Sequence, residues 1–111
     1  MSRSDEELIN EAREHLSVLR QHMASAGLED QTVADAVSMR LAAAIEAVSQ
    51  CSEDRRMRMF GEDWVLMWAT RNRIAHGYAF VDLSIIESTV AEDLPLFEAR
   101  LQREIDGDAP N

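Results

Sequence analysis

Lysine is absent from this 111-residue chain, and cysteine, proline and glycine are scarce. The single cysteine, Cys51, cannot form a disulfide within the chain. Two prolines and four glycines leave few turn signals, which disfavours a many-stranded barrel or sandwich and favours long helices. Apolar residues make up 46% of the chain and charged residues 29%, so the composition is that of a globular domain and not of a disordered chain.

Long hydrophobic runs are also missing. The apolar run Trp64–Ala69 covers only six residues, whereas a helix needs about 20 to span a bilayer. The N-terminus is acidic and lacks the apolar segment of a signal peptide. We therefore expect a soluble, cytoplasmic protein with no membrane partner. The length predicts a single domain over residues 1–106, followed by a frayed tail at 107–111.

The charge balance restricts the partners. Eleven arginines face twenty-one acidic residues, which gives a net charge of −10. Because the phosphate backbone repels such a chain, bulk attraction to nucleic acid is excluded, and any RNA contact must come from a local arginine cluster. Arg55, Arg56 and Arg58 form one such group. A group of this kind is most often a solvated turn, and contact with an anionic partner is the alternative.

Two long helices are predicted in the first half of the chain. Ser4 and Glu7 match a capping box, and apolar residues then follow at steps of three and four up to Gly27. These residues are Leu8, Ala12, Leu16, Leu19, Met23 and Ala26. A second helix is predicted from Asp30 to Gln50. Its buried face consists of Val33, Val37, Leu41, Ala44 and Val48, widened by Ala34 and Ile45.

The second half is predicted to be helical as well. Residues 51–59 are expected to form a connection, with room for a short helical turn. A third helix is predicted from Glu62 to Gly77, with Trp64 and Trp68 more typical of a core than of a base-stacking platform. Residues 78–81 are expected to form a loop.

Asp82 is then expected to cap a fourth helix, and Pro95 falls inside its continuation. Either Asp93 caps a new segment with Pro95 in its first turn, or the helix continues with a kink. Together, these predicted helices indicate an all-α bundle of four or five helices.

The window from Arg71 to Tyr78 gathers side chains suited to phosphate chemistry. Arg71 offers a planar fork for a phosphate, His76 can transfer a proton, and Asn72 can orient a neighbour. A position near a helix C-terminus favours protonated His76. Arg71 and His76 are about 140° apart around an ideal helix. They would therefore not converge well within one chain if the helix stays regular through His76, and two chains related by a two-fold axis could supply them to one cleft.

Each of these features also has an interpretation in which it serves the structure and not catalysis. An Arg and a His near a helix end are usually a solvated cap or salt-bridge partners. His15 and His22 lie beside the first apolar stripe and are more typical of a core edge than of metal ligands. No metal site and no cofactor site is predicted.

The same window resembles the HEPN superfamily, and within it the HepT-like toxins, which carry an Arg, four residues, a His, one residue and a Tyr. Arg71, His76 and Tyr78 match this pattern. The resemblance extends to the upstream Trp64, to the Glu-Ala pair at residues 46–47 and to the Asp-Leu-Pro sequence at residues 93–95. It covers roughly residues 31–103.

This resemblance implies a helical bundle that forms a homodimer, with the motifs of both chains in one cleft. It implies a metal-independent endoribonuclease in which His76 acts as general acid or base on the ribose 2′-hydroxyl, Arg71 holds the phosphate and Asn72 positions it. Arg73 is expected to add to the positive charge, together with Arg55, Arg56 and Arg58.

The resemblance further implies a toxin of a type VII toxin–antitoxin system. Its partner would be an MntA-like nucleotidyltransferase antitoxin, which silences the toxin by attaching AMP to Tyr78. Two other interpretations stay open. One is a non-catalytic, nucleotide-binding accessory subunit of a nucleotidyltransferase, which the acidic charge favours, and the other is a plain helical dimerisation module.

Overall fold

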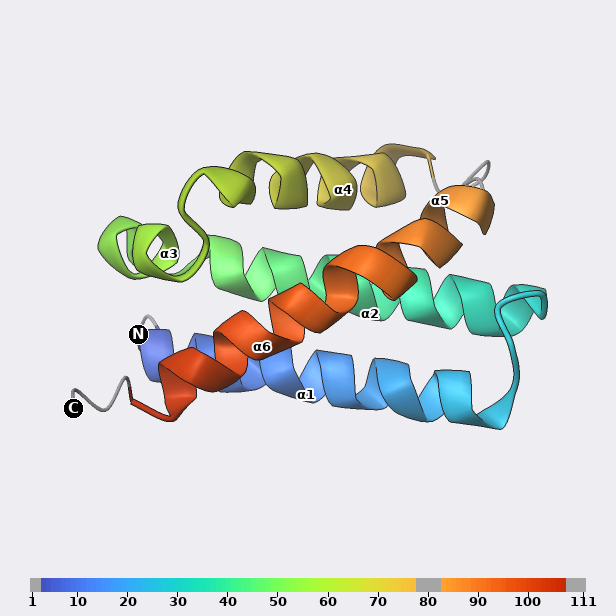
Figure 1. Cartoon of the computed structure of the whole chain (residues 1–111), viewed down its shortest axis with the longest axis horizontal. Coiled ribbons are helices and arrows are strands. Elements are labelled where there is room, and N and C mark those ends of the chain that lie inside the picture. Colours follow the sequence, from blue (N-terminus) through green and yellow to red (C-terminus); the bar gives the residue numbers. More distant parts are fainter. Residues whose placement is uncertain (1–2, 78–82, 108–111) are drawn as a thin grey trace.

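The computed structural model describes residues 3–77 and 83–107, and these residues fold as helices joined by short connections, which confirms the all-α prediction (Figure 1). The elements in chain order are α1 (Asp5–Ser25), α2 (Gln31–Ser49), α3 (Glu53–Phe60), a 3-10 turn η1 (Gly61–Asp63), α4 (Trp64–Gly77), α5 (Leu83–Ser88), a π-helical turn η3 (Thr89–Asp93) and α6 (Leu94–Ile105).

The first two helices begin where the sequence predicts. The Ser4 hydroxyl accepts a hydrogen bond from the Glu7 amide, and the Glu7 side chain accepts one from the Ser4 amide, so both halves of the capping box are present. The Asp30 carboxylate likewise caps α2 by accepting from the amides of Thr32 and Val33. These caps satisfy amides that lack a partner in the first turn of a helix.

Helix α2 occupies the centre of the bundle, with α1 on one side and α4 on the other, and α6 crosses obliquely over them (Figure 1). This position explains why α2 has a wide buried face, on which all seven predicted residues are buried. Of the six predicted residues on α1 and its end, Leu8, Ala12, Leu16 and Leu19 are fully buried, while Met23 and Ala26 pack against the core. The predicted core positions of the first half are therefore confirmed.

The segment after Cys51 is an eight-residue helix, α3, so the expectation of a connection with a short helical turn underestimated its length. The Ser52 hydroxyl caps this helix by accepting from the Arg55 amide. Met59 and Phe60 anchor it in the core. Gly61 then takes a positive φ of 55°, which favours glycine and lets the chain turn toward α4. The sequence of α3 is too polar to reveal a helix by its apolar period alone.

Pro95 does not start a separately capped helix. Asp93 has helical backbone angles and its side chain makes no capping hydrogen bond, so the chain runs from α5 through η3 into α6. In the π-helical turn the Leu94 amide donates to the carbonyl of Thr89, five residues back. This wider turn accommodates Pro95, which has no amide hydrogen to donate. Of the two predicted alternatives, the structure shows the continuous helix.

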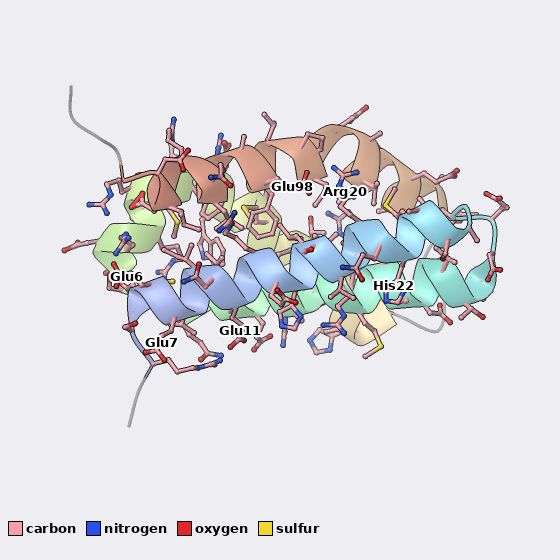
Figure 2. All side chains as sticks on the ribbon, turned by 90° about the horizontal axis from the view of Figure 1, so that it is seen from below. Glu6, Glu7, Glu11, Arg20, His22 and Glu98 are labelled. Atoms are coloured by element: carbon pink, nitrogen blue, oxygen red, sulfur yellow. The ribbon has the colours of Figure 1, made fainter. Side chains whose placement is uncertain are left out.

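Ion pairs fasten α6 to the rest of the bundle. The guanidinium of Arg20 on α1 forms two hydrogen bonds with the carboxylate of Glu98 on α6, at 2.7 and 3.0 Å (Figure 2). Near the end of α6, Glu104 accepts from Arg55 and Arg58 of α3. In the part of the chain that the structure describes, no helix combines the length and apolar character needed to cross a membrane.

Candidate functional site

Helix α4 differs from the other described helices in its charge, because it contains no Asp or Glu. It carries Arg71, Arg73 and His76, although the whole chain has a net charge of −10. This helix corresponds to the one predicted from Glu62 to Gly77: it ends at Gly77 as expected but begins at Trp64, because Gly61–Asp63 form the 3-10 turn η1. Among the described helices, α4 is therefore the one on which an anion meets no carboxylate of the same element.

One side of α4 packs on the core. Ile74 is buried, and Trp64, Met67 and Trp68 are partly buried against the hydrophobic cluster. The rings of Trp64 and Trp68 stack with their centroids 5.9 Å apart. The prediction that these two tryptophans belong to the core is consistent with this packing.

Arg71 is held from three directions. Its Nε donates to Glu46 Oε2 on α2 at 2.7 Å, and its Nη2 lies 2.6 Å from the same oxygen. Its Nη1 donates to Asn72 Oδ1 at 3.1 Å, and the ring of Trp68 lies 4.8 Å from the guanidinium carbon. A guanidinium has five N–H groups. When all three polar contacts are counted, two N–H groups remain, one on each Nη, and these can bind a phosphate.

His76 lies on a different face of α4. It is exposed, and it follows Val65, Ala69 and Asn72 at steps of four, three and four, which places these residues along one outer face. Arg71 instead points toward Glu46 and α2. Because α4 continues through Gly77, the ideal helical pitch keeps Arg71 and His76 on different faces of one chain.

The other predicted site residues are distributed as follows. Asn72 is half-buried and accepts from Arg71, and Arg73 is exposed on α4. Tyr78, the predicted AMP acceptor, lies outside the described residues. Arg55 and Arg58 form ion pairs with Glu104, and Arg55 also pairs with Glu6.

Arg56 packs over the ring of Trp64 at 5.3 Å. Helix α3, which carries these arginines, lies at the opposite end of the bundle from the C-terminal end of α4 (Figure 1). The expectation that Arg55, Arg56 and Arg58 form one positive island with Arg71 and Arg73 is therefore not met. The contacts that these arginines make with Glu6, Glu104 and Trp64 indicate that they hold α3 against the rest of the bundle.

Comparison with known proteins decides the family. A family model described as "Ribonuclease HepT-like" matches residues 5–104. The chain belongs to the HepT-like ribonuclease family. The match covers both helices of the candidate site and agrees with the resemblance seen in the sequence. No curated protein and no solved structure matches the chain in the same comparisons.

Two partners of Arg71 in this HepT-like chain were not predicted. Glu46 was noted only as part of a family pattern, and its contact depends on the register of α2 against α4, which the sequence does not show. Trp68 precedes Arg71 by three residues, a spacing that places both on one side of a helix. That spacing was the available signal for the contact between the ring and the guanidinium.

The histidines of α1 are placed as expected for a core edge. His15 and His22 are half-buried, and Nδ1 of His15 accepts from Arg40 on α2 at 3.0 Å. Among the described residues, no three His, Cys, Asp or Glu side chains are grouped to hold a metal ion. Cys51 is buried, and burial raises the pKa of its thiol to about 11.

Proposed function

We propose that this HepT-like protein is an endoribonuclease whose site is completed by a second copy of the chain. The observation that carries the proposal is the arrangement of α4. Arg71 offers two N–H groups to a phosphate, while His76 lies on another face of the same acid-free helix. A two-fold axis beside α4 would bring the His76 of one chain toward the Arg71 of the other.

The outer face of α4 supports this dimer. Val65 is 71% exposed and Leu66 is 68% exposed, although both are large apolar residues. Ala69 and His76 continue the Val65 face toward the C-terminal end. Covering this strip with the same strip of a second copy would bury apolar surface, and it would avoid the carboxylates through which two chains of charge −10 repel each other.

The reaction that fits these groups is attack of the ribose 2′-hydroxyl on the adjacent phosphate. His76 would remove the hydroxyl proton or protonate the leaving oxygen, and Arg71 would stabilise the charge on the phosphate oxygens. Asn72 holds Nη1 of Arg71 and so orients the fork. Because the nucleophile belongs to the substrate, the proposed reaction requires RNA and is independent of a metal ion.

Mixing two inactive variants tests the shared site. The R71A and H76A proteins should each fail to cleave RNA in the presence of EDTA. After co-expression or joint refolding, half of the dimers are mixed, and each mixed dimer has one intact site, so about a quarter of the wild-type activity should return. Activity in either pure variant would contradict the residue roles. No recovery in a mixture shown to contain mixed dimers would contradict the shared site.

We further propose that the protein acts as the toxin of a toxin–antitoxin pair and that a nucleotidyltransferase attaches AMP to Tyr78. The support is the motif position of Tyr78, two residues after His76. An added phosphodiester charge and nucleoside at this position would oppose RNA binding. Incubation with the cognate enzyme and ATP should add AMP masses to the wild type. The same gain in Y78F would contradict the choice of acceptor.

The net charge of −10 favours a second candidate, a non-catalytic nucleotide-binding subunit of a nucleotidyltransferase. Expression of the protein alone separates the two candidates. Growth arrest that H76A relieves would support the ribonuclease, whereas harmless expression together with tight nucleotide binding would support the accessory subunit.

A further inference from the structure

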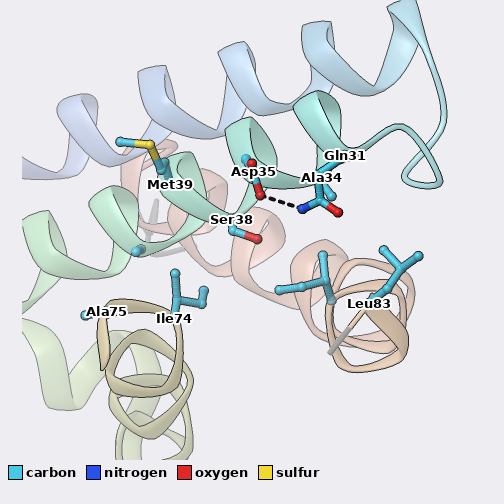
Figure 3. Close-up of a pocket in the computed structure, with 10 residues that line it drawn as sticks. Gln31, Ala34, Asp35, Ser38, Met39, Ile74, Ala75 and Leu83 are labelled. Atoms are coloured by element: carbon cyan, nitrogen blue, oxygen red, sulfur yellow. Dashed lines mark hydrogen bonds between the residues drawn. The ribbon is translucent and has the colours of Figure 1, made fainter. Parts of the chain in front are cut away.

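A cleft lies between the first half of α2, the last turn of α4 and the start of α5 (Figure 3). Its volume is about 630 Å³, which falls within the range of small-molecule sites. Most of its wall is apolar and comes from Ala34, Met39, Ala42, Ile74 and Ile86. An apolar wall of this kind suits the faces of a planar ring system.

Ser38 provides a polar group inside this apolar wall. Its residue is only 6% exposed, and its hydroxyl faces the cleft (Figure 3). It makes no hydrogen bond with any residue that the structure describes. Because this hydroxyl opens into the cleft, it can exchange water for a ligand group that accepts or donates a hydrogen bond.

Asp35 and Gln31 supply acceptors at the α2 rim of the cleft. Gln31 Nε2 donates to Asp35 Oδ1 at 2.8 Å (Figure 3). This bond uses neither Asp35 Oδ2 nor Gln31 Oε1, and both oxygens can accept a hydrogen bond from a ligand. Because a carboxylate at neutral pH accepts and does not donate, the rim selects a ligand edge that presents donors.

One end of the cleft lies near the Glu46–Arg71 pair in the sequence of both helices. Helices α2 and α4 run antiparallel (Figure 1), and the Glu46–Arg71 pair joins them. Ala42 precedes Glu46 by four residues and Ala75 follows Arg71 by four, and both alanines line the cleft. On each helix, about one turn, or 5.4 Å along the axis, separates the residue of the Glu46–Arg71 pair from the alanine that lines the cleft. A nucleotide whose phosphate binds Arg71 can reach the cleft with its own base.

We propose that this cleft binds a nucleobase of the RNA substrate and prefers guanine. Guanine presents two neighbouring donors, N1–H and the N2 amino group, which suit the Asp35 carboxylate, and its O6 can accept from the Ser38 hydroxyl. Uracil presents one N–H between two carbonyl oxygens, which the acceptor-rich rim disfavours. The inference rests on the proposed function, because it makes the cleft the base subsite of the same site.

Binding by the H76A protein tests the cleft without any cleavage step. Titration calorimetry with GMP and UMP should give about a tenfold tighter dissociation constant for GMP, the value of one additional hydrogen bond to a charged group. The D35N variant in the H76A background should lose this preference, and S38A should weaken GMP binding severalfold. As a matched control, D54N changes an exposed carboxylate on α3 and should leave both affinities unchanged.

The outcomes separate this inference from the proposed function. Equal affinities for GMP and UMP, or a D35N variant that keeps the preference, would overturn the guanine site even if the wild type cleaves RNA. A guanine preference that depends on Asp35, in a protein that cleaves no RNA, would support the cleft and remove the ribonuclease. Circular dichroism of each variant establishes that the fold is intact before binding is compared.

Discussion

Glu46 and Arg71 connect the central helix of the bundle to the candidate site. Their side chains meet across the α2–α4 contact, with Arg71 Nε 2.7 Å from Glu46 Oε2, although the residues are 25 positions apart in the sequence. The ring of Trp68 covers one face of the same guanidinium. These two contacts restrict the directions in which Arg71 can present its remaining N–H groups.

The E46Q variant should therefore lower RNA cleavage without unfolding the protein. Glutamine keeps the size of the side chain but removes the charge that orients the guanidinium, and misplacing a phosphate-binding group costs on the order of tenfold or more in rate. Because the pair is partly solvent-exposed, the free energy of unfolding should change by less than about 1 kcal/mol. Initial cleavage rates and urea denaturation measure the two effects.

The E98Q variant is the matched control. It weakens the Arg20–Glu98 pair, which joins α1 to α6 away from α4. It should leave the cleavage rate unchanged. An E46Q protein that cleaves as fast as E98Q would show that Glu46 does not orient Arg71.

The exposed apolar face of α4 predicts a dimer that a single charge disrupts. Leu66 is two-thirds exposed in one chain, so L66E should not disturb the monomer but would place two carboxylates against each other in the proposed interface. Light scattering should show a dimer for the wild type and a monomer for L66E, with cleavage lost in parallel. The control is M57E on α3, where Met57 is also exposed, and it should remain dimeric. A dimeric L66E would place the interface elsewhere.

Glu104 should contribute strongly to stability at neutral pH. Its carboxylate is largely buried and accepts from Arg58 and Arg55, at 2.5 and 2.7 Å. The hydrogen bond from Arg58, and then that from Arg55, holds the pKa of Glu104 below its usual 4.5 against the opposing effect of burial. The E104Q variant leaves two arginines without this acceptor and should lose about 1–3 kcal/mol of unfolding free energy at pH 7.

The contribution of Glu104 to the free energy of unfolding should decrease at acidic pH. Because the folded state lowers the pKa, the stabilisation is complete above about pH 4.5 and disappears as the pH falls through the lower folded value. Wild-type stability should therefore drop more steeply below pH 4.5 than that of E104Q. An E87Q control, which changes an exposed residue of α5, should follow the wild type.

We expect His15 to make the free energy of unfolding depend on pH as well, but more weakly than Glu104 does. Burial, and then the charge of Arg40, lowers the pKa of His15 below 6.5. His15 therefore binds a proton more readily in the unfolded chain than in the folded protein. As a result, the free energy of unfolding should fall as the pH drops below about 6.5. Chemical denaturation between pH 7.5 and 5 should show a shallower decline for H15Q than for the wild type. The S17A protein, altered at an exposed position of the same helix, should keep the wild-type slope; equal slopes for H15Q and the wild type would contradict the assignment.

Cys51 should be unreactive in the folded protein. Its thiol is buried, and burial raises its pKa to about 11, so very little thiolate is present at pH 8. Iodoacetamide should label the native protein slowly and the urea-unfolded protein rapidly, as followed by mass spectrometry. Equal labelling rates in both states would show that Cys51 is accessible.

Local features of the sequence were sufficient for the helices with clear caps and an apolar period. Ser4, Glu7 and Asp30 act on amides within three residues of themselves, and the apolar steps of α1 and α2 describe one side of a regular helix, so no distant contact is needed to predict them. The same reasoning failed for α3, because its charged residues are stabilised by Glu6 and Glu104 from other helices.

The sequence by itself determined the all-helical class, the family motif and the divergence of Arg71 from His76, since each depends only on residue order and helical pitch. The tertiary structure decided that Arg71 meets Glu46 and that Val65 and Leu66 stay exposed. It also decided that the Ser38 hydroxyl opens into a cleft. These contacts depend on the register and rotation of α4 against α2, which result from packing many side chains together and are not encoded in any single segment.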